Sequence, residues 1–138
     1  MANLPGVLCG SFDPFPHCGQ LWAMRQALEA GVCSTIWIGL HVDPSIERPK
    51  KRRPTLTVEE RRHLLEAIRW VSLIEEYETE ADLLAMLKRW GPHVRIQGED
   101  YIGKQFTGKE LGMEVFYAKR KPGWSGTEFE ERIRRNGR

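Results

Sequence analysis

The feature that most constrains the fold is an alternation of short apolar segments with amphipathic ones along the whole chain. The apolar segments, which we expect to be strands, are residues 5–9, 34–40, 71–74, 94–97 and 114–118. The amphipathic segments predict helices at 20–30, from Thr57 through Ile68, from Thr79 to Trp90, and at 125–135. Strand–helix alternation with short connections produces right-handed βαβ units, so the chain predicts a parallel sheet covered by helices.

Polar residues mark where several of these helices begin. Thr57 and Glu60 have the spacing of a capping box, and Thr79 is a suitable cap for the next helix. In the last helix, Phe129 and Ile133 are four residues apart, so we expect both to face the core.

The length of 138 residues indicates one domain, residues 1–138, with a core that needs no disulfide or structural metal. The expected fold is α/β: a single Rossmann-like domain with a five-stranded parallel sheet, order 3-2-1-4-5, and helices on both faces. In such sheets the ligand lies beyond the carboxyl ends of the strands, where the strand order reverses. The polar, glycine-bearing segments that follow strands should therefore converge on one rim; they are residues 10–19, 41–56, 97–104 and 119–126.

Composition excludes several classes of protein. The hydrophobic content of 41% and charged content of 29% are those of an ordinary globular domain, and a net charge of +2 gives no reason to expect nucleic acid or an anionic membrane as partner. Cys9, Cys18 and Cys33 lack C-x-x-C spacing, which argues against a zinc site and suits a reducing cytoplasm. Without a long apolar run, we expect neither a signal peptide nor a membrane span, and a cytoplasmic location.

The segment after the first strand, Gly10 to Gln20, has the features of a phosphate-binding turn. The first amides of a helix lack partners within it, and the helix dipole makes that end electropositive. His17 lies just before the helix, within reach of a phosphate bound there. Gly19 has no Cβ to hold a ligand away, although a glycine can also simply close a strand onto a helix.

The loop after the second strand carries five cations in six positions, Arg48 to Arg53. Exposed cations often only keep a loop soluble, and the run is short and lacks the interleaved aromatic residues of a nucleic-acid site. Its place on the ligand rim favours a polyphosphate. We expect Lys50 to contact phosphate, and Lys51 and Arg53 to face solvent.

The turn resembles the G-(T/S)-F-D and H-x-G-H motifs of the cytidylyltransferase-like nucleotidyltransferases, a family that includes glycerol-3-phosphate cytidylyltransferase. Here the motifs stand as Gly10-Ser11-Phe12-Asp13 and His17-Cys18-Gly19-Gln20. One extra residue separates Asp13 from His17, and Gln20 replaces the second histidine.

Three later segments extend the resemblance over nearly the whole chain. Residues 60–61 and 69–72 are similar to the family's E-R and R-Y-V-D, with Ser72 in place of the acid. Residues 96–104 are similar to M-G-D-D-W-x-G-K, and residues 120–127 to R-T-E-G-I-S-T-T. The four motifs occur in the family's order.

The resemblance implies transfer of a nucleotidyl group from a nucleoside triphosphate to a small phosphorylated acceptor, with release of pyrophosphate. The catalytic residues implied are His17, Gln20, Lys50 and Arg120. The nucleotide-binding residues implied are Gly10, Ser11, Phe12, Asp13, His17, Gly19, Gln20, Gly98, Asp100, Arg120, Ser125 and Thr127. The cations implied for the acceptor phosphate are Lys50, Arg52, Arg61 and Arg69. Mg²⁺ would be held by the nucleotide phosphates with Asp13 close by and no direct protein ligand, in a homodimer.

Three functions stay open. The first is a cytidylyltransferase that uses CTP and a glycerol-3-phosphate-like alcohol, either a polyol or an amino alcohol. The second is an adenylyltransferase that uses ATP and a phosphorylated cofactor precursor. The third is a nucleotide-binding module without catalysis, which the replacements at Gln20 and Ser72 allow.

Overall fold

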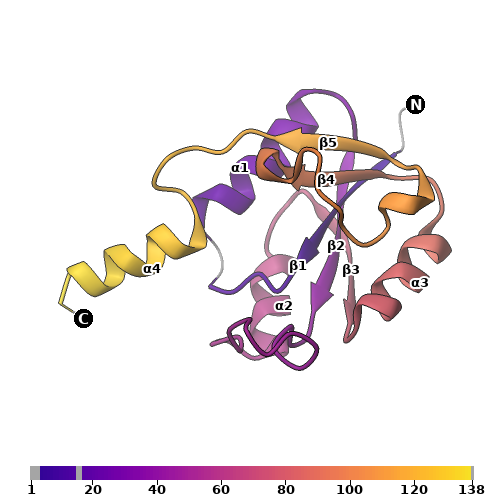
Figure 1. The fold of residues 1–138 in the computed structure, drawn as a ribbon. Coiled ribbons are helices and arrows are strands. Elements are labelled where there is room, and N and C mark those ends of the chain that lie inside the picture. Colours follow the sequence, from indigo (N-terminus) through magenta and orange to yellow (C-terminus); the bar gives the residue numbers. More distant parts are fainter. Residues whose placement is uncertain (1–3, 15–16, 138) are drawn as a thin grey trace.

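The computed structural model describes residues 4–14 and 17–137 (Figure 1). Its strands are β1 (Pro5–Gly10), β2 (Thr35–His41), β3 (Val71–Tyr77), β4 (Val94–Gly98) and β5 (Glu114–Ala118). Its α-helices are α1 (Cys18–Glu29), α2 (Val58–Glu66), α3 (Glu80–Trp90) and α4 (Gly126–Arg135). Every strand and α-helix expected from the alternation of segments is present.

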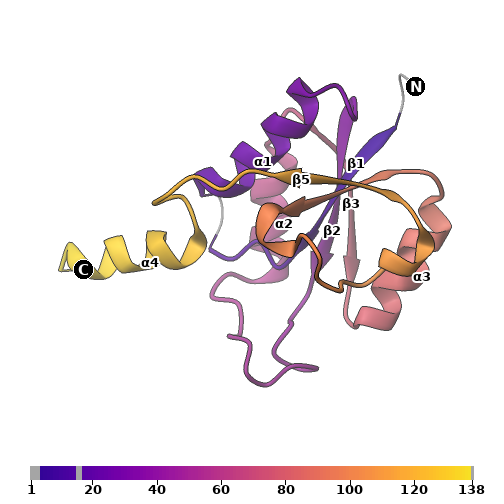
Figure 2. The same cartoon turned by 45° about the horizontal axis from the view of Figure 1, so that its top comes forward.

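The five strands form one parallel sheet in the order β3-β2-β1-β4-β5, which confirms the predicted topology. All carboxyl ends therefore lie at one edge, and the strand order reverses between β1 and β4. Helices α1 and α2 cover one face of the sheet and α3 covers the other (Figures 1 and 2).

Each face of the sheet has its own core. In β2, alternate side chains point to opposite faces, so Ile36 and Ile38 pack against α1 and α2 while Trp37 packs toward α3. Met24 and Ala27 of α1 are fully buried on the first face, and Met86 and Leu87 of α3 on the second. The helices carry their apolar residues at the three- and four-residue spacing that the sequence showed.

Strand β3 is longer than predicted. The apolar run ends at Ile74, but pairing with β2 continues to Tyr77. The two acidic residues in this extension find cationic partners: Glu75 pairs with Arg89, and Glu76 with Arg62. The extension brings the first residues of α3 to the rim where the ligand is expected.

The last helix departs from prediction. In both views α4 projects away from the sheet (Figures 1 and 2), and no residue of this fully described helix is buried. The inward placement predicted for Ile133 is wrong, since its exposed fraction is 42%. Within residues 4–14 and 17–137, no helix has the length and apolarity needed to cross a membrane.

Candidate functional site

The carboxyl edge of the sheet holds two cavities rather than one continuous cleft. The larger has a volume of about 940 Å³ and lies toward β2, β3 and α3. The smaller, about 350 Å³, lies between the start of α1 and the segment after β5. Both are lined by the same stretch at the end of β1, namely Cys9, Gly10, Ser11 and Asp13. Two ligands bound side by side would meet at this stretch.

Asp13 fixes the geometry between the cavities. Its carboxylate accepts hydrogen bonds from the backbone amides of Thr55 (2.9 Å) and Leu56 (2.8 Å). Both residues lie at the end of the cationic loop after β2, which we call the basic loop. Its neighbour Phe12 is buried and adopts a positive φ of 54°, a conformation that costs free energy in a non-glycine residue. The turn is therefore tied to the loop after β2. Residues 15–16 of the motif lie outside the described residues.

His17 is the residue immediately before α1 and lines the smaller cavity. Its Nδ1 lies 3.1 Å from the carbonyl oxygen of Trp124. A carbonyl only accepts, so Nδ1 carries the hydrogen and Nε2 donates only when the ring is protonated. Burial, opposed in part by the Trp124 bond, lowers the pKa of His17, and the charge of Arg120 lowers it further. An anionic phosphate beside Nε2 would raise it again.

Gly19 is required by a contact within the protein. A Cβ at this position would lie 2.2 Å from the carbonyl oxygen of Trp124, the same oxygen that bonds His17. Gly19 therefore allows the close approach of residues 119–126, which we call the strap, and the expectation that it makes room for a ligand stays a prediction. Gly19 still lines the smaller cavity.

Gln20 faces the same cavity from the first turn of α1. Its Oε1 is buried and has no hydrogen-bond partner within the described part of the chain. Oε1 is an acceptor and can take a hydrogen bond from a ligand donor, whereas only the NH2 of the same amide can donate to a phosphate oxygen. The sequence placed Gln20 where the family's second histidine stands, and the structure leaves that position polar and unsatisfied.

The strap closes the other side of the smaller cavity. The side-chain amide of Gln26 in α1 binds both backbone groups of Lys119: it donates to the oxygen at 3.0 Å and accepts from the nitrogen at 2.8 Å. Trp124 packs edge-to-face against Trp22 of α1, with ring centroids 6.1 Å apart. Lys121 lies over the Trp124 ring, 4.2 Å from its centroid. These contacts hold the strap against α1.

Two of the residues predicted to bind the nucleotide, located after β5 and at the end of β4, lie at the smaller cavity. Gly98 and Arg120 line the smaller cavity, and Arg120 pairs with Asp100 at 3.1 Å. Ser125 also lines it, but its hydroxyl is engaged in the capping box of α4 with Glu128. Thr127 is exposed and is not among the lining residues. In this structure the Ser125 hydroxyl therefore caps α4.

The basic loop contributes other cations than the one expected. Arg48, Lys51 and Arg52 line the larger cavity, and Arg52 also forms an ion pair with Glu130 of α4. Lys50 is exposed and is not among the residues lining either cavity. The structure thus brings Lys51, which we expected to face solvent, to the cavity in place of Lys50.

Two predicted acceptor-phosphate cations lie elsewhere. Arg61 has an exposed fraction of 2%, and its guanidinium donates to the backbone carbonyls of Leu56, Ser11, His41 and Val42 at 2.7–3.1 Å. With its donors spent on the protein, Arg61 joins the loops of both cavities instead of binding substrate.

Arg69 precedes β3 and therefore lies at the amino edge of the sheet, opposite the cavities. It stacks over Trp70, with 5.7 Å between the guanidinium carbon and the ring centroid. Ser72 is at the same edge, within hydrogen-bond distance of Thr35. The expectation that Arg69 holds substrate phosphate is not compatible with this position, and the replacement at Ser72 does not touch the site.

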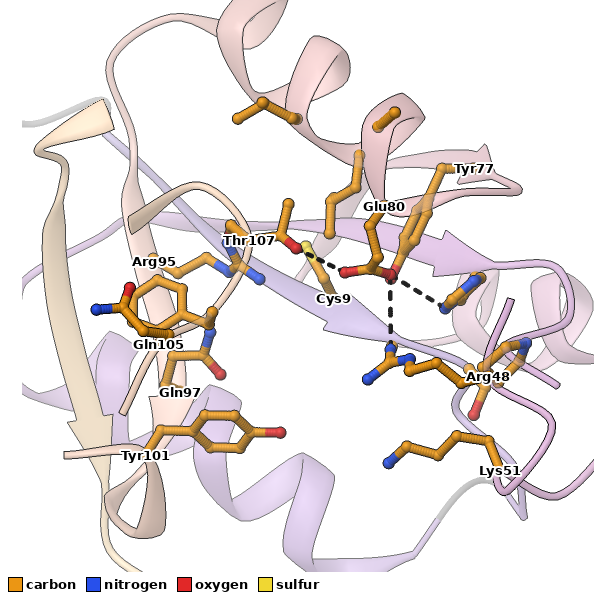
Figure 3. Close-up of a pocket in the computed structure, with 18 of the residues that line it drawn as sticks. Cys9, Arg48, Lys51, Tyr77, Glu80, Arg95, Gln97, Tyr101, Gln105 and Thr107 are labelled. Carbon is orange, nitrogen blue, oxygen red and sulfur yellow. Dashed lines mark hydrogen bonds and ion pairs between the residues drawn. The ribbon is translucent and has the colours of Figure 1, made fainter. Parts of the chain in front are cut away.

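The polar cluster that lines the larger cavity was not predicted from the sequence (Figure 3). Glu80, at the first position of α3, lies among Thr107, Arg48 and His41. Tyr77 stacks on the His41 ring with centroids 4.5 Å apart. A signal existed, since His41 directly follows the second predicted strand, but ending the third strand at Ile74 concealed that Glu80 stands at the same rim.

The chain was compared with known proteins. A model of the cytidylyltransferase-like family matches residues 7–132. The chain is 31% identical over 131 residues to the bifunctional protein HldE of Aliarcobacter butzleri (strain RM4018), covering 92% of this chain and 26% of that protein. It is 32% identical over 131 residues to HldE of Pelobacter propionicus (strain DSM 2379 / NBRC 103807 / OttBd1), covering 90% and 26%. The chain thus spans about a quarter of the length of these relatives.

A solved structure has the same fold. The lipopolysaccharide core biosynthesis protein from Thermoplasma volcanium GSS1 aligns with a TM-score of 0.63 and 17% identity, over 86% of this chain and 96% of that one. Three observations support the same assignment: the strand order, the position of the turn between the two cavities, and the family match over residues 7–132. This chain belongs to the cytidylyltransferase-like family, as its motifs predicted.

Proposed function

We propose that this chain transfers a nucleotidyl group from a nucleoside triphosphate to a small phosphorylated acceptor and releases pyrophosphate. The observation that supports this most directly is the pair of cavities that share Cys9, Gly10, Ser11 and Asp13. The nucleotide occupies the smaller cavity, with its phosphates at the start of α1, and the acceptor occupies the larger one. Bound in this way, the acceptor phosphate and the α-phosphate meet beside the shared stretch.

The reaction needs positioning and charge neutralisation more than proton transfer. An oxygen of the acceptor phosphate attacks the α-phosphorus, the bond from that phosphorus to the bridging oxygen breaks, and pyrophosphate leaves. The attacking oxygen is already ionised near neutral pH, so no general base is required. His17, once protonated, and the amide of Gln20 donate to phosphate oxygens at the start of α1, and Arg120 adds positive charge from the strap.

The residues present suit Mg²⁺ that the nucleotide phosphates hold. Each Asp13 oxygen accepts one backbone hydrogen bond, which leaves a lone pair for a metal-bound water. When bound, Mg²⁺ neutralises phosphate charge. Asp13 itself holds the basic loop in place, so the two cavities keep their positions relative to each other.

CTP is our first candidate for the nucleotide, on the strength of the motif matches at residues 96–104 and 120–127. ATP is the second, and one observation favours it: the indole rings of Trp22 and Trp124 both line the smaller cavity, and a purine offers more ring surface than a pyrimidine for contact with aromatic side chains. Isothermal titration calorimetry with CTP, ATP, GTP and UTP in the presence of Mg²⁺ decides between them. Tighter binding of ATP would transfer the proposal to the adenylyltransferase.

Catalysis is tested by pyrophosphate release. Each nucleotide is incubated with a panel of phosphorylated alcohols and sugars, with His17→Ala as the inactive control. We expect release with at least one pair in the wild-type protein. If the wild-type protein binds nucleotide tightly but releases no pyrophosphate with any acceptor, it is a nucleotide-binding module. The homodimer and the cytoplasmic location stay predictions of the same proposal.

A further inference from the structure

The larger cavity contains two hydrogen-bond acceptors 3.9 Å apart, His41 Nδ1 and Glu80 Oε2, and within residues 4–14 and 17–137 no donor forms a hydrogen bond with Oε2. Nε2 of the buried His41 ring lies 3.2 Å from the carbonyl oxygen of Glu78, so Nε2 carries the hydrogen. Burial lowers the pKa of His41, which favours the neutral ring. Its Nδ1 then presents a lone pair toward Oε2 of Glu80, 3.9 Å away.

Glu80 is held so that only Oε2 is left for a ligand. Its Oε1 accepts a hydrogen bond from the hydroxyl of Thr107 at 2.7 Å. Its backbone amide donates to Oε1 of Glu47 at 2.8 Å. Oε2 is buried and has no hydrogen-bond partner among the residues that the structure describes. A buried carboxylate oxygen without a donor is costly, so this oxygen is suited to a donor brought by a ligand.

The charge around Oε2 favours a neutral donor over a cation. The guanidinium of Arg48 lies 3.6 Å from Oε2, within ion-pair range but too far for a hydrogen bond. It already compensates the carboxylate, and it would repel an ammonium group or a metal ion at the same place. Glu47 lies close enough to complete a metal-binding trio with His41 and Glu80, but its Oε1 is engaged by the Glu80 amide. A hydroxyl group donates without adding charge.

We propose that Glu80 determines acceptor specificity by accepting a hydrogen bond from an acceptor hydroxyl, with His41 Nδ1 as the second acceptor at the same position. The acceptor is thus a polyhydroxylated alcohol or sugar phosphate rather than a phosphorylated amino alcohol. This inference rests on the proposed nucleotidyl transfer.

The test compares Glu80→Gln with wild-type protein in steady-state pyrophosphate release. The probes are glycerol 3-phosphate, sorbitol 6-phosphate, glucose 1-phosphate and mannose 1-phosphate, with phosphoethanolamine as the ammonium-bearing competitor. We expect a hydroxylated probe to be preferred, and Glu80→Gln to raise its KM at least about tenfold, the scale of one hydrogen bond to a charged group. The KM for the nucleotide should stay within about twofold of wild type, because Glu80 lines only the larger cavity.

Glu78→Gln is the matched control, since that carboxylate is exposed two residues away. An unchanged acceptor KM in a folded Glu80→Gln protein that still releases pyrophosphate would overturn the inference alone. Preference for phosphoethanolamine would do the same, as would tight binding of Zn²⁺ by wild-type protein that Glu80→Gln abolishes in calorimetry. Absence of pyrophosphate release with every pair overturns the proposed function, and the inference with it.

Discussion

The two cavities at the rim are built in different ways. The smaller one is enclosed by the turn after β1, the first turn of α1 and the strap, and much of its lining is backbone and small residues. The larger one is enclosed by charged side chains from the loop after β2, the start of α3 and the loop after β4. A family can keep the first kind of site through a short motif, whereas the second kind changes with single substitutions in several loops.

The difference bears on what a sequence can indicate about each ligand. A phosphate at a helix start is recognised by groups that every helix has, so a motif indicates it. The proposed acceptor contacts, Glu80 and His41, are side chains whose meeting depends on the whole fold. The following experiments test whether the two cavities are separable in this way.

The largest effect is expected where both cavities share a support. Arg61→Ala leaves the carbonyls of Ser11, His41 and Val42 without their buried donor, so we expect a loss of about 3–5 kcal/mol of unfolding free energy. Urea denaturation followed by circular dichroism measures it. The control is Arg62→Ala on the same helix, whose ion pairs are partly exposed and should contribute about 1 kcal/mol or less. Equal losses for the two variants would show that Arg61 is no special support.

The next effect belongs to the smaller cavity. His17→Ala removes a charged donor at the start of α1 and should lower kcat/KM at least about a hundredfold, while leaving the KM for the acceptor nearly unchanged. His63→Ala, which alters an exposed histidine on α2, is the control. A loss below about tenfold would remove His17 from the proposed transition-state contacts.

A smaller effect should separate two adjacent lysines at the larger cavity. Lys51→Ala should lower kcat/KM for the acceptor about tenfold to a hundredfold, because Lys51 lines that cavity. Lys50→Ala, the matched variant, should have little effect. Steady-state kinetics with varied acceptor measures both. The reverse order would restore the expectation drawn from the sequence and count against the position of this loop.

The smallest effect concerns pH and again belongs to the smaller cavity. The pKa of His17 is lowered by burial in the free protein, and bound phosphate should raise it. Between those two pKa values, nucleotide binding takes up a proton, so affinity should fall as pH rises through that window, by at most about tenfold per pH unit. Calorimetry in two buffers of different ionisation enthalpy measures the uptake. His17→Gln retains a neutral donor and should lose about one proton of uptake, whereas an unchanged uptake would assign it to the nucleotide.

The fold was predictable because it depends on local patterns. Apolar runs and caps such as Thr57 and Thr79 fixed the elements, and the alternation of strands and helices together with the motif order indicated a sheet that the structure confirms. The extension of β3 was not predictable in this way, because Glu75 and Glu76 are tolerated in a strand only through partners distant in sequence. The exposed position of Ile133 likewise depends on where α4 leaves the domain.

The candidate site was predictable only where backbone groups, such as the amides at a helix start, determine where a ligand can bind. The turn that carries His17, Gly19 and Gln20 lies at the expected helix start. The cations were not predictable from type alone, because an arginine serves a substrate or the protein according to what surrounds it. Arg61 meets four carbonyls and becomes a structural residue, whereas Arg48 meets a carboxylate inside a cavity.

The bond between Gln26 and the strap has a consequence for how nucleotide preference can evolve. Since the Gln26 amide pairs with both the N–H and the C=O of Lys119, the Lys119 N–H is not free to donate to the edge of a base, and its C=O keeps one lone pair. Discrimination between bases is left to other groups around the smaller cavity, several of which are replaceable side chains such as Trp22 and Lys121. If the nucleotide binds as proposed, a lineage can exchange one base for another by point substitutions in these side chains, while the main chain at the start of α1 stays as it is.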